Sequence, residues 1–117
     1  MEQENEWKEI CQKLNIGKLT RHIFLCTGPK CTSNEDGMKA WEHLKTKLKD
    51  EKLNTVYRTK VGCLRICKKG PIGLVYPEGT WYHSLSPENL DLVITNDLKK
   101  NHTVRELVIA EDALDSF

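Results

Sequence analysis

Two pairs of cysteines are the residues of this chain whose type and spacing could do chemistry. Cys26 and Cys31 enclose four residues, Cys63 and Cys67 enclose three, and residues 32–62 separate the pairs. A four-coordinate metal site can be built from two such short loops, each supplying half of the ligands. Thiolate is the ligand that zinc and iron–sulfur clusters select. The spacing therefore predicts a thiolate metal site.

The cellular compartment determines whether spaced cysteines indicate a metal site or structural disulfides. No apolar run approaches the roughly 20 residues of a membrane span, and the acidic N-terminus lacks the apolar stretch of a secretory signal. We therefore expect a cytoplasmic protein that does not enter a membrane. Cytosolic thiols are kept reduced, so spaced cysteines there indicate metal or redox chemistry rather than structural disulfides.

Length and composition predict one globular domain. The chain has 117 residues, of which 38% are hydrophobic and 30% are charged. These values are typical of a folded protein with a single core. The formal net charge of +1 does not favour nucleic-acid binding.

The first element that the sequence predicts is a short amphipathic helix. Trp7, Ile10, Cys11 and Leu14 recur at helical spacing within residues 4–14, and Gly17 follows as a stop. We expect this helix to lie on the core. Cys11 is on its apolar stripe and is expected to be a buried small hydrophobic residue rather than a ligand.

The elements that must position the cysteines are two strands with a helix between them. Residues 21–25 and 54–61 favour strands, and each runs into one cysteine pair. Ser33 begins a helix of about four turns between them. Both cysteine loops therefore follow strands, and we expect them to meet at one end of a sheet.

The second half of the chain predicts a hairpin and a last helix. Residues 72–76 and 80–83 favour strands joined by a turn, and Ser86-Pro87 is a helix start. Leu90, Val93, Ile94 and Leu98 form its expected buried stripe. Residues 103–109 could add a short extended segment. The order predicts an α/β fold in which helices pack on a small mixed sheet.

Three kinds of site compete for the cysteines. A thioredoxin-type disulfide pair uses two residues between its cysteines, which neither pair here has. Structural zinc accepts four thiolates with gaps of two to four residues, so the spacing leaves zinc open. A [2Fe–2S] cluster with two cysteines on each iron is the third interpretation.

Longer motifs resemble one family. Arg21-His-Ile-Phe-Leu-Cys26, Cys63-Leu-Arg-Ile-Cys67-Lys-Lys-Gly-Pro71 and Val75-Tyr-Pro-Glu-Gly79-Thr-Trp-Tyr82 are similar to the thioredoxin-like [2Fe–2S] ferredoxins. The resemblance covers roughly residues 21–110. It implies a thioredoxin-like fold, one [2Fe–2S] cluster held by Cys26, Cys31, Cys63 and Cys67, and one-electron transfer between redox enzymes. Members of the family are often homodimers.

The domain boundaries follow from this resemblance and from the predicted elements. We expect an N-terminal helical extension over residues 1–17, the ferredoxin domain over 18–110 and a loose tail over 111–117. No nucleophile–base pair, phosphate loop or substrate site is evident in the sequence. The chain is therefore expected to be an electron-transfer protein rather than an enzyme.

The short first loop keeps an alternative open. Residues 27–30 form a shorter connection than many family members have, similar to the iron–sulfur subunits of NADH-dehydrogenase and hydrogenase flavin modules. The chain could therefore be a subunit or accessory domain of such an oxidoreductase. A second alternative is a cluster sensor or a zinc-stabilised interaction module. The hairpin motif favours the free ferredoxin.

Basic residues beside the cysteines are candidates for tuning the potential or for docking. Arg65 lies between two ligands, Lys68 and Lys69 follow the second pair, and Lys30 lies in the first loop. A four-thiolate cluster carries about −2 when oxidised and about −3 when reduced, so nearby cations favour the reduced form. The same cations would attract a redox partner with an acidic docking surface.

Overall fold

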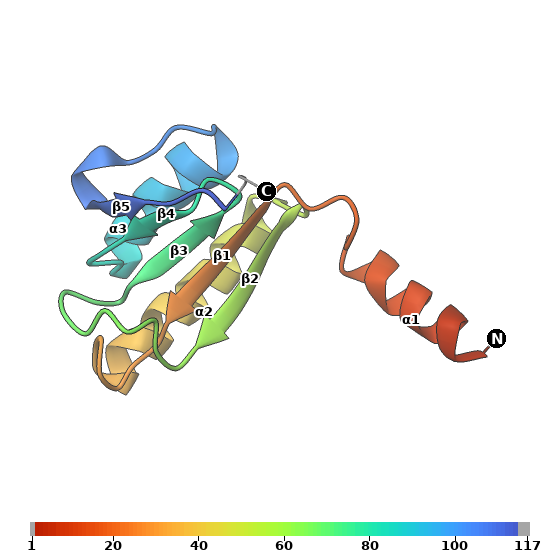
Figure 1. Ribbon diagram of the computed structural model, residues 1–117, viewed down its shortest axis with the longest axis horizontal. Helices are drawn as coiled ribbons and strands as arrows, with labels where there is room; N and C mark the ends of the chain where they lie inside the picture. The colour runs from red at the N-terminus through yellow and green to blue at the C-terminus, as the bar shows by residue number, and fades with distance from the viewer. Residues whose placement is uncertain (1, 115–117) are drawn as a thin grey trace.

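A five-stranded mixed sheet is the centre of the fold. The computed structural model describes residues 2–114, with side chains from residue 5. The strands are β1 (Arg21–Cys26), β2 (Val56–Val61), β3 (Gly73–Tyr76), β4 (Thr80–Tyr82) and β5 (Val108–Glu111). Their order in the sheet is β2-β1-β3-β4-β5, and only β1 and β2 run parallel (Figure 1). The predicted mixed sheet is confirmed.

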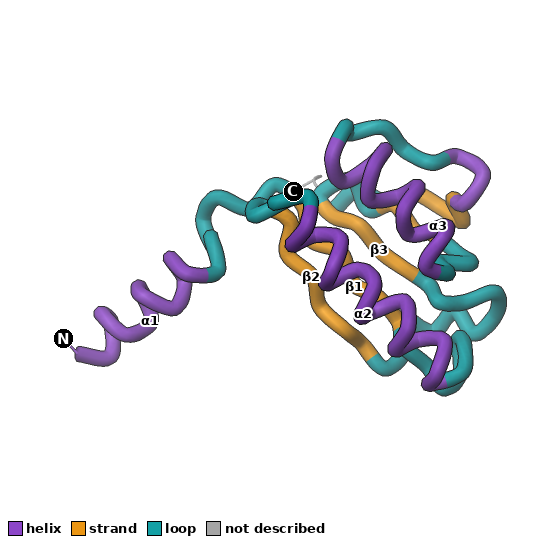
Figure 2. Tube along the Cα trace, turned by 180° about the vertical axis from the view of Figure 1, so that it is seen from behind, coloured by secondary structure: helices purple, strands orange, loops and turns teal. Residues whose placement is uncertain are grey.

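Helices cover one face of this sheet. α2 (Asn34–Asp50) and α3 (Pro87–Leu92) both lie in front of the strands in the view from behind (Figure 2). Ile23 and Leu25 point from β1 into the core between sheet and helices, where they meet the fully buried Leu44 and Leu90. This two-layer arrangement follows from the alternation of the strands and the apolar stripes of the helices.

α2 begins where the sequence predicts. The Ser33 hydroxyl accepts a hydrogen bond from the Asp36 N–H at 3.0 Å and so satisfies one free donor of the first turn. Lys47 and Lys49 occupy the last turn, where cations interact favourably with the helix dipole. The helix therefore spans the sheet from the cysteine loops to its opposite end.

The last helix differs from its predicted form in its second half. Ser86 caps α3 as expected, accepting from the Asn89 N–H at 3.3 Å. The chain then continues from Val93 to Lys99 as the π-helix η1. The predicted buried stripe is confirmed, and Leu92, which falls off that stripe, is 43% exposed.

A fifth strand closes the described part of the chain. The short 3-10 helix η2 (Arg105–Leu107) leads into β5, which pairs with β4 in antiparallel fashion. β5 continues to Glu111, one residue beyond the expected domain boundary, and the Asp112 N–H donates to the Gly79 carbonyl at 2.8 Å. Residues 115–117 of the expected tail lie outside the described residues.

The N-terminal helix does not lie on the core. α1 (Glu2–Lys13) projects away from the sheet (Figure 1). Trp7 is 61% exposed, Ile10 is 53% exposed and Cys11 is partly exposed. The expectation of a helix packed on the core, with Cys11 buried, is wrong, because an apolar stripe does not specify which surface will cover it. No described helix is long and apolar enough to cross a membrane.

Candidate metal centre

The two cysteine loops lie at the same end of the sheet. β1 and β2 are parallel neighbours, and their last residues, Cys26 and Val61, are opposite each other. Cys63 follows two residues after β2. Because parallel strands end at the same edge, the loops after β1 and β2 begin side by side. The placement expected from the sequence is therefore present in the fold.

The first pair of cysteines is buried. Cys26 has no exposed surface and Cys31 is 6% exposed. Their Sγ atoms are joined in a disulfide, a pairing that the sequence did not predict. A sulfur in a disulfide is not a thiolate, so this bond must be reduced before either residue can bind iron.

The second pair is exposed. Cys63 and Cys67 are free thiols on the loop after β2. The Arg65 N–H donates to the Cys63 Sγ at 3.1 Å, and the positive φ of Arg65 (69°) gives the loop a tight turn between the two cysteines. Within residues 2–114, no three cysteine, histidine or acidic side chains are gathered into one metal-binding group. The structure thus brings the loops together without gathering all four sulfurs.

The surroundings of the cysteines suit an iron–sulfur cluster. Cys26 and Cys31 pack against the fully buried Ile72, and four partly buried apolar side chains surround this group: Val61, Leu64, Ile66 and Trp81. An apolar shell limits water access, and N–H donors such as that of Arg65 stabilise negative charge on sulfur. Once the Cys26–Cys31 disulfide is reduced, the four thiols in this setting would fit a [2Fe–2S] group.

Gly70 allows the two loops to approach closely, and Gly28 allows a close approach within the first loop. The Gly70 N–H donates to the Cys31 carbonyl at 3.0 Å, and a Cβ at Gly70 would lie 2.2 Å from that oxygen. Gly28 has a φ of +93°, and its Cβ would lie 2.4 Å from the Thr32 carbonyl oxygen. Gly62 has open space around it. The contribution of Gly70 was not predicted; its only signal in the sequence is the Gly70-Pro71 step directly after the second pair.

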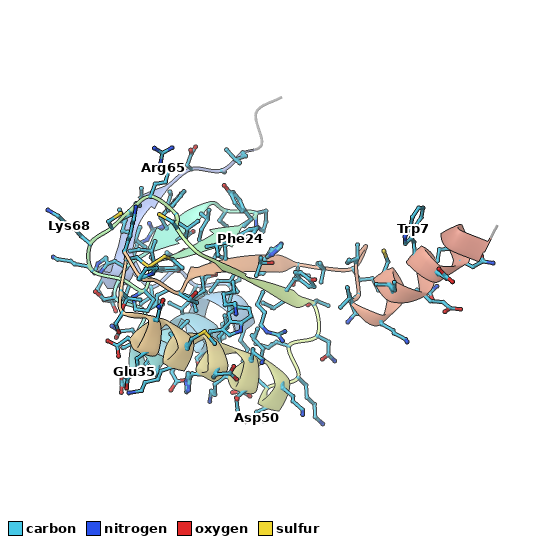
Figure 3. The ribbon with its side chains drawn as sticks, turned by 90° about the horizontal axis from the view of Figure 1, so that it is seen from below. Trp7, Phe24, Glu35, Asp50, Arg65 and Lys68 are labelled. Atoms are coloured by element: carbon cyan, nitrogen blue, oxygen red, sulfur yellow. A yellow bond between two sulfur atoms is a disulfide. The ribbon has the colours of Figure 1, made fainter. Side chains whose placement is uncertain are left out.

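The four basic candidates all lie on the surface. Arg65, Lys68, Lys69 and Lys30 are exposed, and none of them forms an ion pair among the described side chains. Arg65 and Lys68 extend from the end of the molecule opposite Trp7 (Figure 3). The positive charge around the cysteine loops is therefore available to a partner.

Arg58 on β2 is also basic, but its side chain packs against α2. The Arg58 guanidinium lies over the Trp41 ring of α2, 5.5 Å from its centroid. This contact holds Arg58 on the helix-covered side of the sheet. Arg58 is therefore not part of the exposed basic group around the cysteines.

Two known ferredoxins are similar to this chain in sequence. The chain is 28% identical over 100 residues to "Ferredoxin, 2Fe-2S" of Aquifex aeolicus, covering 78% of this chain and 90% of the relative. It is 28% identical over 96 residues to a protein of the same name from Clostridium pasteurianum, covering 75% and 94%. No family model matches the chain.

Solved ferredoxin structures have a fold similar to that of this chain. The thioredoxin-like [2Fe-2S] ferredoxin from Aquifex aeolicus superposes with a TM-score of 0.72 at 26% identity, covering 85% of this chain and 99% of that one. The wild-type structure of that protein at 1.5 Å resolution gives a TM-score of 0.70 at 27% identity, covering 79% and 98%. Sequence, coverage and fold agree: over most of its length the chain is similar to the thioredoxin-like [2Fe–2S] ferredoxins.

Proposed function

We propose that this protein is a [2Fe–2S] ferredoxin that carries single electrons between redox proteins. The observation that carries the proposal is the pairing of β1 with β2, which brings two dithiol loops to one sheet end in a chain whose relatives are named as 2Fe-2S ferredoxins. Cys26, Cys31, Cys63 and Cys67 are the proposed ligands. When bound, the cluster supplies reversible one-electron chemistry.

The two pairs have different surroundings and therefore different proposed roles. Cys26 and Cys31 lie in the apolar interior, where they would hold their half of the site away from water. Cys63 and Cys67 are on the exposed loop, where their half of the site is open to a partner. We therefore infer that electrons enter and leave through the loop that carries Cys63 and Cys67.

The same loop would favour the reduced state. The Arg65 N–H donates to the Cys63 Sγ, and the Arg65 side chain adds a positive charge between two proposed ligands. Both groups stabilise the additional negative charge that arrives with the electron. Arg65 is thus proposed to raise the reduction potential.

Charge also suggests the kind of redox partner. Lys30, Lys68, Lys69 and Arg65 form an exposed basic group around the cysteine loops. Complementary charge increases the association rate of transient complexes, so we propose partners with an acidic docking surface. We place the protein in the cytoplasm because thiolate ligands persist in a reducing compartment.

The free carrier is preferred over a subunit of a larger oxidoreductase. The short 27–30 loop supports the subunit alternative, whereas the match covers 99% of the solved ferredoxin chain. The similarity therefore extends over almost the full length of a protein that is described as a ferredoxin. Association with a larger enzyme would not alter the proposed ligands.

The test is the colour and metal content of protein purified without oxygen. We expect a brown protein with broad visible absorption that bleaches on reduction, and about two irons and two labile sulfides per chain. A titration should consume one electron per cluster. A colourless protein with stoichiometric zinc would overturn the proposal, because zinc has no redox chemistry.

A further inference from the structure

α1 presents an apolar face that its own chain does not cover. Trp7 and Ile10 in α1 and Leu14 directly after it lie at helical spacing, and all three are exposed. Isolated helices of about 12 residues are marginal in water, and most helical stability comes from packing of an apolar face. α1 therefore requires a surface to pack against.

Hydrogen bonds close the end of α1 and attach it to the domain. The Ile16 N–H donates to the Cys11 carbonyl at 2.9 Å, which closes the end of the helix. The Asn15 side chain donates to the Asn54 carbonyl at 2.7 Å and fixes this end to the turn before β2. Moving this end of α1 away from the turn would break the Asn15–Asn54 contact.

A groove of suitable character begins at this attachment point. It has a volume of about 470 Å³ and is lined mainly by the end of α2 and by β2. Its apolar lining includes Leu48, Leu53 and Val56, and its cations include Lys45, Lys49 and Arg58. We call it the α2/β2 groove. Lys13, Leu14 and Asn15 of the same chain also line it, whereas Trp7 and Ile10 are not among its lining residues.

The charges of α1 and the α2/β2 groove are complementary. α1 contains four glutamates and two lysines, which gives it a net negative charge. On the groove wall, Lys45 pairs with Glu42 at 3.5 Å, whereas Lys49 forms no ion pair with any described side chain. Glu6 precedes Ile10 by one helical turn and so flanks the apolar face. An α1 helix in the groove would bring acidic side chains to the cationic wall.

We propose that α1 of one copy binds in the α2/β2 groove of a second copy, and that the second copy reciprocates. The exchange buries Trp7 and Ile10 on the apolar lining and brings Glu6 toward Lys49. A twofold axis makes both contacts equivalent, so the dimer is closed. α1 lies outside residues 21–110, and the proposal does not depend on the proposed electron transfer.

The first test measures self-association of the full-length protein with its cluster by sedimentation equilibrium. Wild-type protein should be a dimer, and Ile10→Glu should raise the dissociation constant at least about tenfold by placing a charge in the apolar contact. Leu92→Glu is the matched control, because Leu92 is an exposed leucine on α3, and it should leave the constant unchanged. Visible absorption and circular dichroism report that each variant is folded.

Reversing the charges of Glu6 and Lys49 then distinguishes binding of α1 to a second copy from binding to its own groove. Glu6→Lys and Lys49→Glu should each weaken the dimer at low salt. A one-to-one mixture of the two variants should restore it, because one contact becomes Lys–Glu and the other is native. Lys30→Glu, in the first cysteine loop, should have no effect on association.

Several results would overturn the exchange. One is a wild-type protein that is monomeric at every concentration tested. A second is a dimer that Ile10→Glu does not weaken. A third is rescue by the Glu6→Lys, Lys49→Glu double variant but not by the mixture, because that pattern would mean that α1 binds its own groove.

Discussion

The N–H of Gly70 donates to the carbonyl of Cys31 at 3.0 Å, and this hydrogen bond joins the two cysteine loops. Gly70 follows the second pair by three residues, and Cys31 ends the first pair. The contact requires the two backbones to approach so closely that a Cβ at Gly70 would lie 2.2 Å from the Cys31 oxygen. The relative position of the proposed ligands therefore depends on a missing side chain.

Gly70→Ala should weaken cluster retention. The added methyl group collides with backbone atoms of Cys31 and must separate the loops, and overpacking of this kind costs about 1–3 kcal/mol. The measurement is the temperature at which the visible absorption is lost. Gly62→Ala is the matched control, because it adds the same methyl group to the second loop in open space. Equal bleaching temperatures for the two variants would contradict this prediction.

Replacement of any proposed ligand should destroy or strongly destabilise the cluster. Alanine at Cys26, Cys31, Cys63 or Cys67 removes one sulfur–iron bond, and the visible spectrum and iron content report the loss. Cys11→Ala should leave both unchanged, because Cys11 lies on α1 away from the sheet. Loss of iron from Cys11→Ala, with retention in one of the other four variants, would show that the assignment is wrong.

Arg65→Glu should lower the reduction potential. The guanidinium favours the added electron and a carboxylate opposes it, although water around this exposed side chain reduces the effect. Lys69→Glu should shift the potential less, because Lys69 lies outside the pair Cys63–Cys67. Voltammetry of both variants and of the wild type checks whether Arg65→Glu shifts the reduction potential more than Lys69→Glu does.

The same two variants should also slow electron transfer to an acidic partner. Salt screens charges, so the difference from wild type should shrink as ionic strength rises. Transfer rates measured against salt concentration check this expectation. An unchanged potential in Arg65→Glu, together with salt-independent transfer, would mean that the basic group is ordinary solvated surface.

The buried Asp97 should add a pH dependence to stability. Burial raises the pKa of its carboxyl above 3.8, and this effect outweighs the hydrogen bond from the Tyr82 hydroxyl and the charge of Arg21. The folded state therefore binds the proton more tightly than the unfolded state. The contribution of Asp97 to stability is fully present below the unfolded pKa and is lost as pH rises through the folded pKa.

Asp97→Asn should remove this dependence. The free energy of unfolding of wild type, minus that of the variant, should fall as pH rises from about 4 through the raised pKa. Denaturant unfolding of both proteins across this range checks the sign, and carboxyl-carbon NMR checks the midpoint of Asp97. A difference that rises with pH would contradict the direction of the shift.

Regular periodicity made much of the sheet and its helices predictable. The run of residues 21–25 predicted β1, and the helix start at Ser33 predicted α2. Because each predicted strand runs into a cysteine pair, the sequence alone indicates that the two loops meet. These features depend on short-range patterns that recur along the chain.

Other features depend on contacts that no local pattern records. The stripe of Trp7 and Ile10 predicted a helix but not that it would project away from the sheet. The π-helix after Leu92 keeps the same buried residues as the predicted α-helix, so the stripe could not distinguish the two. The Cys26–Cys31 disulfide likewise depends on how the first loop folds.

Loop conformation was the least predictable part of the site. Arg65 and Lys69 adopt positive φ values of 69° and 57°, although neither is a glycine. Left-handed backbone is unfavourable for such residues and gives no recognisable signal in the sequence. The N–H of Arg65 reaches Cys63 because of this conformation, so its role could not be anticipated from spacing.

The position of Cys26 at the end of β1 has a consequence for how this site can change in evolution. Cys26 is in register with Val61, and its side chain lies on the face opposite Leu25. Deleting one residue within β1 would turn the cysteine to the helix-covered face. Insertions between Cys26 and Cys31 leave that register intact and lengthen only a loop, which proteins tolerate well. Descendants of this fold can therefore vary the gap between ligands freely, while the strand before the first ligand must keep its length.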